Sequence, residues 1–481
     1  MNNLKTRLAT TSVDVVPRSA VRIARGAAAK RTLPEYIVAF MSFSSDSCDY
    51  AGEFQKFRTR EWERAFKWLD AAGLAFYFLQ KLRNTNTTDA IPACVMSRLQ
   101  RNFEANQQRV DYMQQQFEVL NQKLKDASVR FVVLKGLSLI PQFCPDRLLR
   151  YQGDFDYLVD EQSLGAAQQV LVEAGYRSKP SPSSQEFIFL PQGMGEPSRR
   201  ADQYYARTPH AVELHLDIWD CDLDGVSLTP NLFSVERATT HHFNGVPFAA
   251  LADEDAFLLQ VLHTCHHMFS HWVRMSCLLE IAYFLSQYAS HQELWSRIEA
   301  RVGDCLILRE FVVVVTEMAA KLFAAPLPEL VQDWGLTIRT GPRVWIDNYA
   351  RQWVFGELPI HQFCLFPGAK LVRFLHQQFK SNASNRESLP RNRLLPPSRL
   401  SRIASSVRDN PWLLSHRTWW IRHLLIQRSL FHLLAGLRYL VEIPRWLSLN
   451  RARMHLSSAE VESLDRPLPV IADGKTGSSQ V

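Results

Sequence analysis

The feature that most constrains the fold is a change in hydrophobic periodicity at Arg130. Before it, apolar residues between 35 and 127 recur every three or four positions, which predicts helices. Arg130 begins a short run of β-branched and apolar residues that ends at Leu134, which predicts a strand. Three later runs also predict strands, and they lie at 155–159, 186–190 and 210–218. With helical spacing at 163–174, these runs predict a small mixed sheet with helices, an α+β unit.

Helical spacing returns after Asp253, so helices are expected on both sides of the sheet unit in the sequence. A stretch rich in Pro, Arg and Ser at 385–400 predicts a linker. The predicted parts are a disordered basic tail (1–34), an N-terminal helical region (35–127), the α+β core (128–250), a helical region (251–370), a basic aromatic helical segment with the linker (371–456) and a disordered tail (457–481).

Composition excludes several classes of protein. A chain of 481 residues, 46% hydrophobic and 21% charged, is not collagenous, low-complexity or mostly disordered. Eight scattered cysteines without a C-x-x-C pair predict free thiols in a reducing, cytoplasmic setting. The most apolar stretch, 424–443, is interrupted by charged residues, so no transmembrane span is predicted.

The chemistry is concentrated in the predicted strands. Asp154 and Asp156 stand at i and i+2 of one strand, so both carboxylates point to the same face. Glu213, in the alternating stretch Val-Glu-Leu-His, is a third acid on a neighbouring strand, preferred over Asp217 because apolar residues flank it. Three carboxylates on one face predict a site for one or two Mg²⁺ ions that hold phosphate oxygens.

Residues that suit phosphate binding lie close by. Gly136 allows a close approach of backbone to phosphate, and Lys135 and Arg150 are cations on either side of it. His215 lies two residues after Glu213 and shares its face. It is predicted either to orient a bound oxygen or transfer a proton, or to be a hydrogen-bonded, half-buried histidine.

Together the motifs read L-K-G, then R-x-x-x-D-x-D-x-L-V, then V-E-L-H. This pattern resembles a poorly characterised bacterial family of the DNA polymerase β-like nucleotidyltransferase superfamily. The resemblance covers about residues 55–300, including the histidine-bearing stretch after Leu258. Unlike the wider superfamily, the chain has no hydroxyl residue directly after Gly136, and 17 residues separate Gly136 from Asp154.

The resemblance implies a polymerase β-like core and metal-dependent transfer of a nucleoside monophosphate from an NTP to an unknown acceptor. It implies that Asp154, Asp156 and Glu213 bind Mg²⁺ or Mn²⁺, and that Lys135 and Gly136 meet the triphosphate. The alternative is a non-catalytic scaffold that binds a nucleotide or other ligand in the same pocket and docks through its basic C-terminal helices.

A second cluster, on a predicted helix, contains Cys265 and four histidines: His263, His266, His267 and His271. Without an H-E-x-x-H motif, a structural or substrate-facing role is favoured over a zinc hydrolase. Glu280 matches an acidic position of the family; it would otherwise be an acid on a helix surface.

The segment 370–455 holds sixteen Lys and Arg residues against three acids, whereas the whole chain carries a net charge of +7. The basic character therefore belongs to this segment. Arginines and aromatic residues interleave within 411–446. Three interpretations stay open: a packed helical subdomain with solvated arginines, a helix on an anionic membrane surface, or a nucleic-acid contact.

Overall fold

The computed structural model describes residues 31–44, 48–181, 183–192, 204, 210–228, 232–243, 245–270, 274–356, 368–380 and 414–464. The predicted linker at 385–400 and most of both predicted tails lie outside these residues. In the described part of the chain, no helix combines the length and the apolar character needed to cross a membrane.

The predicted α+β core with a small mixed sheet is confirmed. Seven strands form one sheet in the order β3-β4-β5-β2-β1-β7-β6. Its strands are β1 (Phe131–Val133), β2 (Asp154–Val159), β3 (Tyr176–Lys179), β4 (Glu186–Pro191), β5 (Ala211–His215), β6 (Ala238–Phe243) and β7 (Val246–Leu251). The β2–β5 and β1–β7 pairs are parallel and the other pairs are antiparallel.

Three strands were not predicted: β3, at one edge of the sheet, and β7 and β6, of which β6 is the other edge. Strands β6 and β7 form an antiparallel hairpin in which Ala238 pairs with Leu251 and Phe243 with Val246. Asn-Gly at 244–245 is a strong hairpin signal and could have located this turn. The predicted strand at 210–218 is shorter than expected because Asp217 accepts hydrogen bonds from the backbone of Ile218 and Trp219 and starts a turn.

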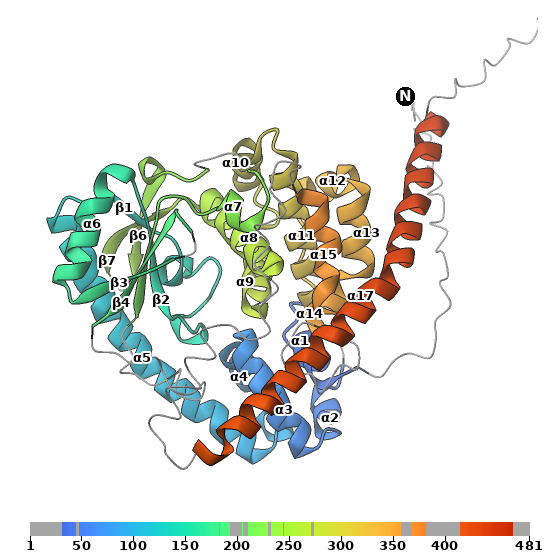
Figure 1. Cartoon of the computed structure of the whole chain (residues 1–481), viewed down its shortest axis with the longest axis horizontal. Helices are drawn as coiled ribbons and strands as arrows, with labels where there is room; N and C mark the ends of the chain where they lie inside the picture. The colour runs from blue at the N-terminus through green and yellow to red at the C-terminus, as the bar shows by residue number, and fades with distance from the viewer. Residues whose placement is uncertain are drawn as a thin grey trace, which may run out of the picture.

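Helices surround this sheet (Figure 1). The N-terminal helices are α1 (Leu33–Phe40), α2 (Tyr50–Gln55), α3 (Thr59–Ala72), α4 (Ala75–Asn84) and α5 (Ala93–Asp126). Within the core are α6 (Glu161–Glu173) and α7 (Cys221–Asp224). After it come α8 (Asp253–Phe269), α9 (Met275–Tyr288), α10 (Gln292–Val302), α11 (Leu306–Phe323), α12 (Glu329–Thr337), α13 (Thr340–Asn348), α14 (Ala350–Gly356), α15 (Val372–Phe379) and α17 (Leu414–Leu464).

The two faces of the sheet belong to different apolar cores. One face packs against α5 and α6, and its buried side chains include Phe155, Tyr157 and Val212. The other face contributes Leu134, Leu158 and other residues to a larger core shared with α8, α9 and the N-terminal helices. Side chains alternate along a strand, so residues 154, 156 and 158 of β2 all face α8 and its neighbours. The candidate site therefore lies between the sheet and these helices.

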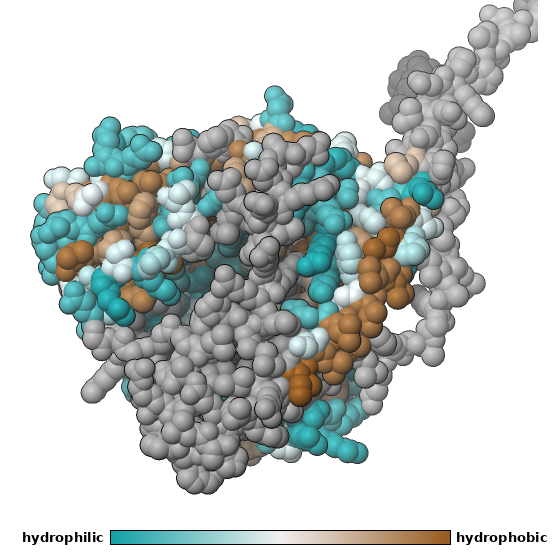
Figure 2. Space-filling model, in the orientation of Figure 1, coloured by the Kyte–Doolittle hydropathy of each residue, from teal (hydrophilic) through white to brown (hydrophobic). Residues whose placement is uncertain are grey.

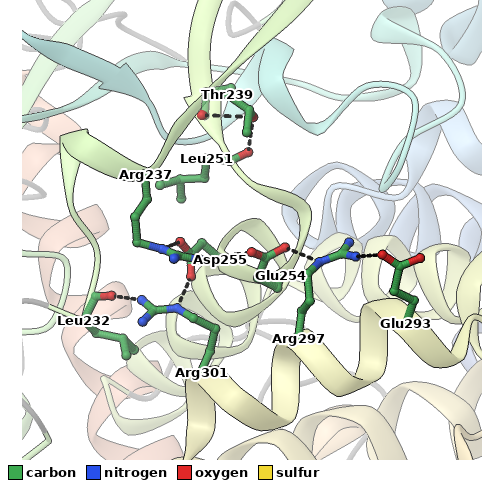
Figure 3. A network of polar contacts seen from close by, with 10 residues as sticks. Leu232, Arg237, Thr239, Leu251, Glu254, Asp255, Glu293, Arg297 and Arg301 are labelled. Carbon is green, nitrogen blue, oxygen red and sulfur yellow. Dashed lines mark hydrogen bonds and ion pairs between the residues drawn. The ribbon is translucent and has the colours of Figure 1, made fainter.

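A network of arginines and carboxylates fixes the start of α8 (Figure 3). Asp255 is fully buried, and it accepts hydrogen bonds from Arg237 Nε at 2.8 Å and Arg301 Nε at 2.6 Å. Glu254 accepts from Arg237 and Arg297. These acids lie in the first turn of α8, where the helix dipole favours negative charge. The network ties α8 to α10 and to the edge of the sheet.

Candidate active site

Two parallel strands bring the main side chains of the site together. Asp156 on β2 is directly opposite Glu213 on β5, so their side chains leave the same face side by side. His215 lies two residues further along β5, with its Nε2 3.3 Å from Asp156 Oδ1 and 3.9 Å from Glu213 Oε2. Phe155 and Tyr157 alternate with the acids and are buried on the opposite face. The hydrophobic pattern of β2 thus sets the direction of its carboxylates.

Asp156, Glu213 and His215 each offer a ligand atom within 4.8 Å of the other two. Among the described residues, this is the one set of three or more His, Cys, Asp or Glu side chains close enough to share a metal ion. Asp154 shares the face but lies outside this set. Burial and the neighbouring charge of Asp156 raise the pKa of Asp154.

Lys135 supplies a positive charge to these acids. Its Nζ lies 3.0 Å from Asp156 Oδ1, and its side chain is 15% exposed. Burial alone would lower the pKa of this amine, but Asp156, Glu213 and Asp154 together raise it, so Lys135 is charged. Lys135, which is predicted to bind the triphosphate, therefore contacts Asp156, a carboxylate of the candidate metal site.

The two paired carboxylates differ in protonation. Burial opposes ionisation of Asp156, but the charge of Lys135 and the hydrogen bond with His215 hold its pKa well below the usual range. Burial, with the charges of Asp156 and Asp154, raises the pKa of Glu213 to about 9. Glu213 therefore keeps its proton at neutral pH unless a further cation enters the site.

This difference predicts a pH dependence of stability. Glu213 has a higher pKa folded than unfolded, so its contribution is full below the unfolded value and is lost as pH rises towards 9. In metal-free buffer we expect the free energy of unfolding to fall with pH over this window, at most by about 1.4 kcal/mol per pH unit. Chemical denaturation of wild type and Glu213→Gln at several pH values measures it. Equal slopes for the two proteins would contradict the assignment.

Gly136 occupies a position that no other residue fits well. Its φ is +71°, in the left-handed region, and a Cβ here would stand 2.0 Å from Gln152 Nε2. Gln152 is held in place, because its Nε2 donates to the Asp154 carbonyl at 2.7 Å and its own carbonyl accepts from Arg109. The glycine thus allows the segment after β1 to pack against the segment that leads into β2.

Gly136→Ala is therefore expected to destabilise the protein by about 2 kcal/mol, through backbone strain and displacement of Gln152. Gly165→Ala is the matched control, because a Cβ there has no atom within 4 Å and the residue lies inside α6. The control should be more stable than wild type by about 0.5–1 kcal/mol. Denaturant unfolding of both variants measures the contrast, and equal effects of the same sign would disprove it.

Arg150, predicted at the triphosphate, is paired with Glu280 on α9. Its Nε donates to Glu280 Oε1 at 3.0 Å, and the Glu280 side chain is fully buried. The Tyr77 hydroxyl, from α4, lies 3.2 Å from the same oxygen and 3.1 Å from Cys144 Sγ. Of the two interpretations of Glu280, an acid on a helix surface is wrong, because the side chain is fully buried. Through Glu280, Arg150 links the segment before β2 to α9 and, by way of the Tyr77 hydroxyl, to α4.

Arg150→Gln is expected to cost about 3–5 kcal/mol, because it leaves the Glu280 carboxylate buried without its cation. The double variant Arg150→Gln/Glu280→Gln removes both charges and should recover part of that loss. Arg351→Gln, which breaks the exposed pair with Glu35, is the control and should change stability little. Thermal unfolding compares all three, and a double variant less stable than Arg150→Gln would refute the argument.

A family model described as an uncharacterised nucleotidyltransferase matches residues 58–324, more than half of the sequence. The chain belongs to this nucleotidyltransferase family. The resemblance inferred from the sequence motifs is thereby confirmed at the level of the family. No curated protein and no solved structure matches the chain.

The histidines of the second cluster that the structure describes, His263, His266 and His267, lie on α8, within the matched region. His263 and His267 are one turn apart, with their Nε2 atoms 3.1 Å from each other. Burial, together with Lys135 and neighbouring histidines, lowers the pKa of both, and that of His267 falls to about 3. His266 Nδ1 lies 2.9 Å from Asp224, on α7. His271 lies outside the described residues.

Sequence reasoning missed the partners that join distant segments of the chain. Tyr77, Asp224 and Gln152 had no motif to mark them, and each contacts a residue of interest through the fold. The signal for His215 was present, since it shares the strand face of Glu213. Its place beside Asp156 depends on strand order, which the sequence pattern did not specify.

Proposed function

We propose that the protein transfers a nucleoside monophosphate from an NTP to an acceptor hydroxyl or phosphate, with Mg²⁺ or Mn²⁺, and releases pyrophosphate. The observation that carries the proposal is the pairing of Asp156 with Glu213 in adjacent parallel strands, with His215 beside them. Membership of the nucleotidyltransferase family supports the reaction class.

The donor set fits a divalent cation. Two carboxyl groups and one imidazole lie within 4.8 Å of one another, and burial, with the charges of Asp156 and Asp154, raises the pKa of Glu213 so that it is protonated. Carboxylate oxygens suit Mg²⁺ and Mn²⁺, whereas the imidazole nitrogen of His215 favours Mn²⁺ over Mg²⁺. We propose that Asp156, Glu213 and His215 hold the ion and that Asp154 lies next to it, as a ligand of the nucleotide-bound state.

The residues around the site would then have separate roles in the reaction. A bound divalent ion would neutralise phosphate charge during an in-line displacement. Lys135, released from Asp156, would contact the triphosphate or the leaving pyrophosphate, and the Gly136 backbone would lie against it. Glu213, once deprotonated, would accept a hydrogen bond from the acceptor hydroxyl and orient it. Arg150 would position the Asp154 segment through Glu280.

One observation favours the alternative, a non-catalytic nucleotide- or ligand-binding scaffold. Lys135 already neutralises Asp156, so the group of side chains is partly charge-balanced without a metal ion. A scaffold of this kind would bind an NTP and leave it intact.

Pyrophosphate release separates the two functions. The protein is incubated with each NTP, Mn²⁺ and fractions of candidate acceptors, namely sugar phosphates, small hydroxylated compounds, RNA and protein. We expect pyrophosphate from wild type with one acceptor class and none from Asp156→Asn. NTP binding without pyrophosphate in every fraction would favour the scaffold and overturn the catalytic proposal.

A further inference from the structure

Helix α17 carries an exposed apolar stripe. Of the fourteen large apolar side chains classed as exposed in the described part of the chain, eight lie on this helix. Figure 2 shows them as a continuous brown band along α17. The α17 stripe consists of Ile426, Leu430, Leu433, Leu437, Leu440, Val441, Leu447 and Met454.

The opposite face of α17 is fixed against the protein. The Tyr439 and Trp446 rings stack on Phe374, with centroids 4.6 Å and 4.9 Å away, and Ala435 is buried. Lys370 Nζ donates to the His432 carbonyl at 3.0 Å. Residues 435, 439, 442 and 446 recur at helical spacing, so the stripe residues 430, 433, 437 and 440 point away from the body. Packing of this face therefore fixes the rotation of α17 about its own axis, and the stripe points away from the body.

The helix around the stripe is strongly basic. Between 414 and 454 the sequence has seven arginines and one acid, Glu442. Glu442 belongs to the packed side: its side chain is 14% exposed, and its Oε2 lies 3.3 Å from the Tyr349 hydroxyl. Arg445, Arg451 and Arg453 are exposed, with Arg445 3.6 Å from Glu442 and Arg453 3.4 Å from Asp347, whereas Arg438 points to the body and donates to Gln352. The outward surface thus combines an apolar band with positive charge and presents no carboxylate over this length.

A second copy of the chain suits this surface poorly. Stripe residues 426, 430, 433, 437 and 440 alternate steps of four and three, as in a coiled coil, but coiled coils place opposite charges beside the seam. A second copy of α17 would offer the arginines no partner acid, because Glu442 is on the packed side and no other acid occurs between 414 and 459. An anionic lipid surface offers both an apolar phase and negative headgroups.

We propose that α17 attaches the protein to an anionic membrane surface. The helix lies in the plane of the interface with the stripe among the acyl chains, and arginine side chains reach the lipid phosphates. Residues 426–454 give a contact about 42 Å long at the α-helical rise. The helix lies on the membrane and does not span it. This inference is independent of the proposed reaction, because it uses no residue of the candidate active site.

Sedimentation of the full chain with lipid vesicles tests the proposal. Two compositions are compared, phosphatidylcholine alone and phosphatidylcholine with about one third phosphatidylglycerol. The test variant is Leu433→Ser/Leu437→Ser/Leu440→Ser. The matched control is Val119→Ser/Val172→Ser/Leu336→Ser, which removes exposed apolar side chains from three other helices.

Wild type and control should bind anionic vesicles equally, and the stripe variant should bind about tenfold or more weakly. Wild-type binding should also fall with added salt and be weak on phosphatidylcholine alone. Equal binding by the stripe variant and wild type, or equal binding to both vesicle types, would overturn the proposal. A wild-type dimer in light scattering that the stripe variant converts to monomer, without vesicle binding, would assign the stripe to a second copy instead.

Discussion

Lys135→Met is expected to lower the metal-free free energy of unfolding by about 3–5 kcal/mol, because it leaves buried carboxylates without their cation. Lys135 Nζ lies 3.0 Å from Asp156 Oδ1, and Asp154 and Glu213 also act on its charge. A divalent ion would replace the missing charge. We therefore also expect the variant to bind Mn²⁺ about tenfold or more tightly than wild type, since no amine competes for Asp156.

Thermal unfolding with and without Mn²⁺ measures both effects. The melting temperature of Lys135→Met should start below that of wild type and rise more when Mn²⁺ is added. Lys56→Met is the control, because Lys56 is exposed and paired with Glu53. It should unfold like wild type in both buffers. If Mn²⁺ stabilises Lys135→Met no more than wild type, the positive charge of Lys135 does not substitute for that of a metal ion.

Asp156→Asn should weaken Mn²⁺ binding by at least about 100-fold. Asp156 contacts both Lys135 and His215 and is also paired with Glu213, so its loss removes the common partner of the site. Titration of Mn²⁺ followed by electron paramagnetic resonance gives the dissociation constant directly.

Asp111→Asn is the control for that experiment. Asp111 is an exposed acid paired with Arg147, away from the strand face that carries the site. Because Asp156→Asn also deprives Lys135 of its partner, circular dichroism is needed to show that the variant is folded. His215→Asn is a second variant, with a milder expected loss of Mn²⁺ affinity. Wild-type affinity in both site variants would exclude the proposed metal site.

The sequence was sufficient to predict the strands that carry the site, because their patterns are local. Asp154 and Asp156 alternate with the buried Phe155, and Glu213 lies between Val212 and Leu214, so the face of each acid follows from a period of two. Gly136 was predicted to allow phosphate to approach the backbone closely. In the structure the group that approaches it is the side chain of Gln152.

The contacts between distant segments were not predictable in this way. Arg150 suggested a phosphate ligand because it is a cation near Asp154, yet it pairs with Glu280, 130 positions later in the chain. The strand order that joins Asp156 to Glu213 and His215 is likewise a property of the whole sheet. The periodicity of one segment carries no information on which charged residues of other segments will pair with its charged side chains.

Calorimetric titration of ATP, CTP, GTP and UTP in the presence of Mg²⁺ tests the central claim most directly. Wild type and the double variant Asp154→Asn/Asp156→Asn are compared, with folding checked beforehand. At least one NTP should bind wild type, and that binding should be lost in the double variant. If no NTP binds wild type, or if the double variant binds equally well, the carboxylate face of β2 and β5 is not a nucleotide site.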